Sequence, residues 1–257
     1  ITKSLDSKVK EFHRHELLDE YQFLFLDGLT LSVKGSLKAK KKLVLVAYGI
    51  TMFGKKELIS FRVASSESEA SWEAFLNDLY KRGLKGENLK LIITDGCPGL
   101  HAAIDTVYAY TKRQHCWVHK LRNVAKYLRK SDEKEVLKEA KKIYTADTNR
   151  EAGRSFKSWK NHWRRKYPKA INCIEKDLDE LLSFLELPLP KEYKKLIRTR
   201  IRTTNVIERS FREVRRRTRP MNCFTNQDSV NRIIFAIFTR LNTKWEDKPL
   251  EEFTQFN

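Results

Sequence analysis

The chain has 257 residues, 40% of them hydrophobic, which is enough for one large domain or for a domain with a sizeable insertion. Its 52 lysines and arginines exceed its 33 aspartates and glutamates, and the net charge of +19 favours nucleic acid over a membrane as partner. No apolar stretch approaches the roughly 18 residues that cross a bilayer, and the four cysteines lack the density of a secreted disulfide scaffold.

The first part of the chain predicts a mixed α/β sheet. A short polar helix within residues 1–20 is followed by β-like runs at 21–27, 43–50 and 57–63, whose short connectors are typical of antiparallel hairpins. The elements expected next are a helix at 68–80, a strand at 90–95, a helix at 98–110 and a strand at 112–117. This order predicts a ribonuclease-H-like fold, in which helices flank a five-stranded mixed sheet.

The middle of the chain has little strand signal and strong helical periodicity, which predicts an all-helical insertion. Two further helices are expected at about 205–219 and 226–245. The predicted domain organisation is therefore the first part of the core at 1–119, the helical insertion at 120–200, and the C-terminal helices of the core at 201–257.

Two aspartates end apolar runs, and a glycine follows each. Asp27 comes after 21–26 and Asp95 after 91–94. Asp-Gly is a common turn pair, so that a turn explains either one alone. A carboxylate at the end of a buried strand is costly unless it is paired or binds a cation, and carboxylate oxygens are the ligands that Mg²⁺ takes. We predict that both aspartates are metal ligands.

A third carboxylate is expected from the arginine-rich helix, and we favour Glu208. Asn205 and Glu208 also match a capping box, in which the glutamate would need no metal. However, Glu208 lies at the edge of the buried face that Ile207 and Phe211 define. Glu213, the alternative, lies five residues further on and points elsewhere.

Cys116 and His119 have the Cys-x-x-His spacing of half a zinc site, which His115 and Cys97 could complete. No second pair has zinc-finger spacing. We interpret Cys116 and His119 as a structural pair that supports the site just after the last core strand.

Nine arginines lie between residues 198 and 219. The helix expected at about 205–219 contains only two acidic residues, Glu208 and Glu213. A charge run is usually a solvated face, but repulsion among so many like charges favours an anionic partner here. Contacts with DNA phosphates are predicted for the arginines at the helix of Glu208, namely Arg209, Arg212, Arg215, Arg216, Arg217 and Arg219.

In combination, these motifs resemble the catalytic domain of Mutator-type transposases from bacterial insertion sequences. The resemblance covers about residues 20–245. The segments that carry it include Leu26-Asp27-Gly28, Thr94-Asp95-Gly96-x-x-Gly99-Leu100, Gln114-x-Cys116-x-x-His119-x-x-Arg122-Asn123 and Thr203-Thr204-Asn205-x-x-Glu208-x-x-x-Arg212.

The resemblance implies a DDE-type transposase with Asp27, Asp95 and Glu208 as its acidic triad and with Cys116 and His119 as a family signature. It implies two Mg²⁺ ions, replaceable by Mn²⁺ and about 3.5–4 Å apart, for cutting the element's ends and joining the freed 3′-OH to target DNA. The implied partners are double-stranded DNA (terminal inverted repeats and target) and a second copy of the chain in the DNA complex. The implied location is the cytoplasm of a prokaryote, at the nucleoid. Family members usually carry an N-terminal region that binds the repeats, and this chain, which begins at Ile1, is expected to be the catalytic core.

Two alternatives stay open from the sequence. One is a ribonuclease-H-like nuclease that cuts without strand transfer. The other is a domesticated DNA-binding protein that keeps the fold without the reaction.

Overall fold

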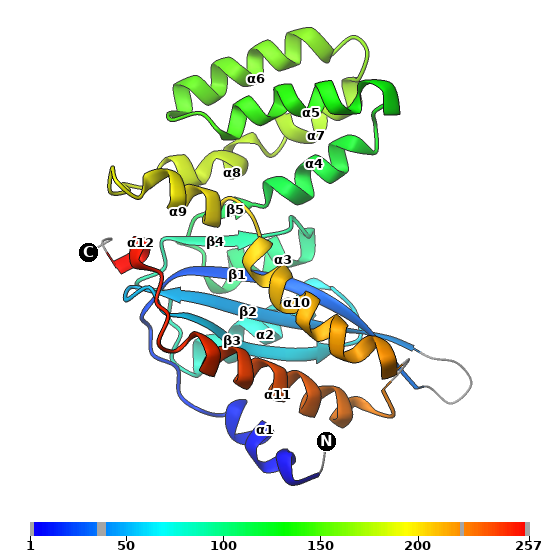
Figure 1. Cartoon of the computed structure of the whole chain (residues 1–257), viewed down its shortest axis with the longest axis vertical. Coiled ribbons are helices and arrows are strands. Elements are labelled where there is room, and N and C mark those ends of the chain that lie inside the picture. Colours follow the sequence, from blue (N-terminus) through cyan, green and yellow to red (C-terminus); the bar gives the residue numbers. More distant parts are fainter. Residues whose placement is uncertain (1–2, 35–39, 222–223, 255–257) are drawn as a thin grey trace. The chain divides into compact units, whose positions relative to one another are not determined.

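A computed structural model of the chain describes residues 3–34, 40–221 and 224–254 (Figure 1). One five-stranded sheet has the order β3-β2-β1-β4-β5, with β1 antiparallel to β2 and β2 antiparallel to β3. The strands are β1 (Tyr21–Val33), β2 (Lys40–Thr51), β3 (Lys56–Ala64), β4 (Leu91–Thr94) and β5 (Arg113–His115). The predicted α/β fold, a mixed open sheet with flanking helices, is confirmed and is compatible with a ribonuclease-H-like fold.

The chain forms two compact units. The first comprises residues 1–92, 97–111 and 205–257, and the second comprises 93–96 and 112–204. The domain ranges expected from the sequence, 1–119, 120–200 and 201–257, stay a prediction. No described helix is both long and apolar enough to cross a membrane.

In the first unit, helices pack on both faces of the hairpin strands. Its helices are η1 (Lys3–Leu5), α1 (Asp6–Phe12), α2 (Glu69–Lys81), α3 (Pro98–Val107), α10 (Asn205–Thr218), η3 (Arg219–Met221), α11 (Gln227–Trp245) and α12 (Glu251–Thr254). Leu24 and Leu26, two positions apart on β1, join Trp72 of α2 and Leu100 of α3 in one buried cluster. This alternation is what a two-residue side-chain period produces.

The opposite face of the same strands is covered by the C-terminal helices. The ring of Phe23 contacts Phe253 of α12, and the ring of Phe61 on β3 contacts Phe238 of α11. α10 also contacts β1 and α11. α11 packs through an apolar stripe, because Val230, Ile233, Ile234, Ile237 and Phe238 are all buried.

One strand boundary predicted from the sequence is wrong. β1 does not end at Asp27 but continues to Val33, with Gly28 paired to Leu45 of β2. Leu29, Leu31 and Val33 alternate with polar or small residues, and pairing along the long β2 keeps this segment extended. The Asp27-Gly28 pair therefore lies inside a strand and forms no turn.

The second unit is helical apart from β5 and the end of β4. Its helices are α4 (Trp117–Ala125), α5 (Lys130–Tyr144), α6 (Asn149–Trp163), α7 (Pro168–Glu175), α8 (Leu178–Leu182), η2 (Ser183–Leu185) and α9 (Lys194–Ile201). Trp159 is buried in this unit and donates a hydrogen bond from its indole nitrogen to the Val136 carbonyl at 3.0 Å. Between β5 and α10 the described structure contains only helices, as the periodicity predicted.

Candidate active site

Asp27 is a buried carboxylate on the face of β1 that α10 and α11 cover. Only 6% of the residue is exposed. Asp27 pairs with Val46, and Val46 pairs with Phe61, whose ring contacts α11. Directly paired residues project from the same face of a sheet, so the Asp27 side chain points to the α10–α11 layer. One of its oxygens accepts a hydrogen bond from the Gly28 amide at 2.7 Å.

Glu208 lies in the first turns of α10, in the same unit as Asp27. It is half-buried, between the buried Ile207 and the exposed Arg209. The inner face of the helix consists of Ile207, Ser210, Phe211, Val214 and Thr218. Glu208 therefore lies at the edge of the buried face, as expected from the sequence.

A capping box of Asn205 and Glu208 would require Asn205 to precede the helix, and the structure differs on this point. α10 begins at Asn205 itself, so that Thr204 is the residue that precedes the helix. A capping box is present instead at the start of α11, where the Asn226 side chain accepts from the Ser229 amide at 2.9 Å. The Ser229 hydroxyl accepts from the Asn226 amide at 3.3 Å in return.

Glu213 is engaged in ion pairs within α10. Its carboxylate accepts hydrogen bonds from Arg216 at 2.9 and 3.0 Å and from Arg217 at 3.0 Å. These bonds lower the pKa of Glu213 to about 2. A carboxylate held by two guanidinium groups of its own helix is a poor candidate for a third metal ligand.

Asp95 follows β4 in the second unit, at a strand end as predicted. Gly96 has a φ of +95°, a conformation that favours glycine, and its amide donates to the Thr94 hydroxyl at 3.3 Å. A Cβ at Gly96 would lie 3.3 Å from the imidazole of His115. The turn that carries Asp95 is thus held between Thr94 and His115.

The buried imidazole of His115 belongs to a polar network of the second unit. Its Nε2 atom lies 3.1 Å from a Glu180 oxygen, and Arg113 donates to the same carboxylate at 2.7 Å. The ammonium group of Lys120 is bonded to Asp177, whose pKa is lowered by Lys120 and His115 despite partial burial. The sequence analysis did not predict this network. Its members lie far apart in the sequence, in β5, in α4, in α8 and at the residue before α8.

Cys116 lies directly after β5 and precedes the first residue of α4. Its sulfur accepts hydrogen bonds from the amide of Thr204 at 3.2 Å and from the hydroxyl of Thr204 at 3.3 Å. Burial raises the pKa of the Cys116 thiol, although the hydrogen bonds from Thr204 act in the opposite direction. The Trp117 amide also donates to the Arg202 carbonyl at 3.0 Å. His119 is half-buried one turn along α4.

The arginines of α10 and η3 are divided between two sides of the helix. Arg209, Arg212, Arg215, Arg216 and Arg219 are exposed, whereas Arg217 is half-buried. An α-helix turns about 100° per residue, which places Arg212 and Arg215 of α10 within about 40° of Glu208, and Arg219 follows in η3. Arg216 and Arg217 lie about 80° and about 180° from Glu208, and both pair with Glu213.

The proposed ligands are all carboxylates, a donor set that fits Mg²⁺ or Mn²⁺. Asp27 and Glu208 are in the first unit, where α10 packs on β1, and Asp95 is in the second. The burial of Asp27 is consistent with a cation, because a buried carboxylate needs a compensating charge or hydrogen bonds.

Comparison with known proteins identifies the family. The model of the family described as "Transposase, Mutator family" matches residues 1–248. The chain is 30% identical to the transposase for insertion sequence element IS905 of Lactococcus lactis, over 99% of this chain and 63% of the relative. It is 31% identical to the transposase for ISRM5 of Rhizobium meliloti, over 95% of this chain and 60% of the relative. It is also 31% identical to the transposase for IS256 in transposon Tn4001 of Staphylococcus aureus, over 95% of this chain and 61% of the relative.

The chain therefore belongs to the Mutator family of transposases. It spans about 60% of the length of these relatives.

Proposed function

We propose that this chain is the catalytic domain of a DDE-type DNA transposase, which cuts the ends of an insertion sequence and joins the freed 3′-OH to target DNA. The observation that carries the proposal is the position of Asp27. A buried carboxylate inside strand β1 faces the layer that contains the helix of Glu208. In a chain of net charge +19, such a carboxylate fits metal-dependent chemistry on a polyanion.

Asp27, Asp95 and Glu208 would hold two Mg²⁺ ions, or Mn²⁺ in their place. The chemistry that such ions supply is activation of the attacking hydroxyl and stabilisation of the leaving 3′ oxygen. The three carboxylates would fix the positions of these charges, and the burial of Asp27 would limit the access of bulk water. Arginines beside Glu208 neutralise phosphates and hold the DNA strand against the site.

The proposed partners are the element's terminal inverted repeats, the target duplex and, in the DNA complex, a second copy of the chain. The experiment that tests the function supplies a duplex with a pre-cut element end and a target plasmid, with Mg²⁺ or Mn²⁺. Covalent joining of the 3′ end to the target is the expected result. Cutting without joining would support the nuclease alternative, and binding without either reaction would support a domesticated DNA-binding protein.

A further inference from the structure

A basic groove runs between α10 and α11 in the first unit. One part of it has a volume of about 620 Å³, and the part that continues along the helices has about 440 Å³. Both parts share Arg217, Ile237 and Arg240 in their lining, so that they form a continuous groove. Ile237 and Ala236 supply an apolar floor.

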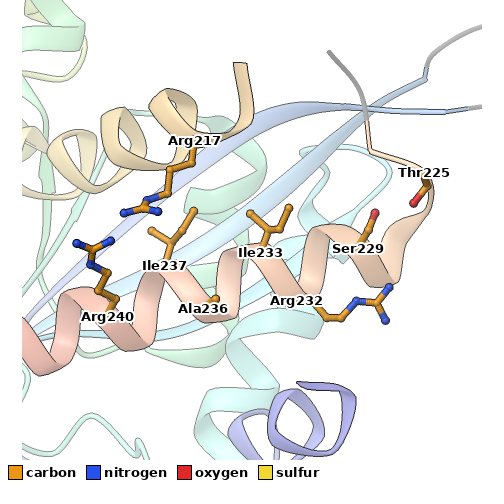
Figure 2. Close-up of a pocket in the computed structure, with 8 residues that line it drawn as sticks. All are labelled: Arg217, Thr225, Ser229, Arg232, Ile233, Ala236, Ile237 and Arg240. Atoms are coloured by element: carbon orange, nitrogen blue, oxygen red, sulfur yellow. The ribbon is translucent and has the colours of Figure 1, made fainter. Parts of the chain in front are cut away.

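Two guanidinium groups point into this groove from opposite sides. Figure 2 shows Arg217 of α10 and Arg240 of α11 directed into the space between the helices, over Ile237. Arg232 points away from them, and it forms an ion pair with Asp6 at 2.8 Å. Arg209, Arg216 and Lys244 line the continuation of the groove.

The groove has an excess of positive charge. The acid in its lining is Glu213, whose carboxylate is engaged by Arg216 and Arg217. The Ser210 hydroxyl lines the same groove, is buried, and has no hydrogen-bond partner among the described residues.

We propose that this groove binds the phosphodiester backbone of DNA through Arg217 and Arg240. The inference rests on the proposed function and adds a second contact surface to it. Arg212 and Arg215 lie within about 40° of Glu208 around α10, whereas the groove-lining residues of α10 lie about 80–200° from it. The forked guanidinium groups match carboxylate or phosphate oxygens in pairs, and the proposed function selects phosphate as the ligand.

The test measures binding of a labelled DNA duplex by the 257-residue chain over a range of salt concentrations. The variant carries Arg217→Gln and Arg240→Gln, and the matched control carries Arg14→Gln, an exposed arginine elsewhere in the first unit. The double variant is expected to bind on the order of tenfold or more weakly. Its slope of log K against log salt should fall by about 1.8, which is about 0.9 for each lost phosphate contact. The Arg240→Gln variant alone, which leaves the Glu213 pair intact, should give about half of this decrease.

Photo-cross-linking tests the contact directly. The photoreactive residue p-benzoylphenylalanine replaces Thr225, which is exposed and lines the groove. Cross-linking to DNA is expected. Cross-linking to a second copy of the chain would contradict DNA binding by the groove. So would an unchanged salt slope in a double variant that still joins DNA. Neither result would contradict the proposed transposase function. Failure of the unmodified chain to bind or join any DNA would count against the proposed function itself.

Discussion

Thr204 donates two hydrogen bonds to the sulfur of Cys116, one from its amide at 3.2 Å and one from its hydroxyl at 3.3 Å. Both residues are buried, and 88 positions separate them in the sequence. Thr204 immediately precedes α10, on which Glu208 lies. Cys116 therefore contacts the residue that immediately precedes the helix of the proposed third carboxylate.

We predict that Cys116→Ala lowers DNA joining by more than it lowers DNA affinity. The loss of the sulfur leaves a buried amide and hydroxyl unsatisfied, which costs about 1–3 kcal/mol of stability. Cys116→Ser, which keeps an acceptor at this position, should restore part of both losses. Thermal unfolding and joining of a pre-cut end measure the two effects, and Cys173→Ala, a half-buried cysteine of α7, is the matched control.

His119→Ala is also expected to lower DNA joining by more than it lowers DNA affinity, because we interpret His119 as a structural residue beside the candidate site. Metal analysis separates this interpretation from zinc binding. Stoichiometric zinc in the purified chain, absent from Cys116→Ala, would show that the pair is a metal site.

For the carboxylates we predict that Asp27→Asn, Asp95→Asn and Glu208→Gln each abolish cutting and joining while DNA binding persists. Each change removes a charged ligand at nearly constant volume. The loss should exceed the roughly 10- to 100-fold that is typical of residues that only support a metal ligand. Glu213→Gln is the matched control on the same helix, because its carboxylate is held by Arg216 and Arg217. An active Glu208→Gln together with an inactive Glu213→Gln would show that the wrong glutamate was assigned.

For the arginines beside Glu208 we predict contacts with phosphates and no reading of bases. Replacing Arg212, Arg215 and Arg219 by glutamine should lower the slope of log K against log salt by about 2.7, or about 0.9 per contact. Affinity should fall equally for duplexes of unrelated sequence. The slope of Arg14→Gln should not change. If the triple variant keeps the slope of the unmodified chain, this side of the helix is simply solvated.

Much of the fold follows from local sequence patterns, and its exceptions have physical causes. The strand at Asp27 extends further than predicted because pairing of residues 28–33 with β2 outweighs the turn preference of Asp-Gly. The strand end at Asp95 was predictable, since Gly96 does adopt a positive φ there.

Contacts between distant segments had no local signal. The spacing of Cys116 and His119 identified a motif, but nothing near it in the sequence pointed to Thr204. Likewise, Arg240 and Lys244 stand on the polar side of a helix whose core stripe is evident. Their role depends on which helix lies alongside, and the sequence does not specify that α10 does.

Two glycine substitutions with opposite expected signs test the packing beneath the candidate site. Gly99 lies in the first turn of α3, where an added Cβ would lie 2.8 Å from the Glu69 nitrogen and 3.1 Å from the Ser68 carbonyl carbon. Backbone atoms cannot move aside as a flexible side chain can. Gly99→Ala should therefore separate α2 from α3 and lower the free energy of unfolding by about 1–3 kcal/mol.

Gly153 is the matched control, because it lies within α6 and, apart from the backbone of its own helix and its chain neighbours, no described atom would be within 4 Å of its added Cβ. Alanine is the better helix former by about 0.5–1 kcal/mol, so that Gly153→Ala should stabilise the chain. Urea unfolding of both variants measures the two changes. Equal effects of the two substitutions would mean that close contact between α2 and α3 does not require glycine at position 99, and that the loop ahead of α2 can shift without cost.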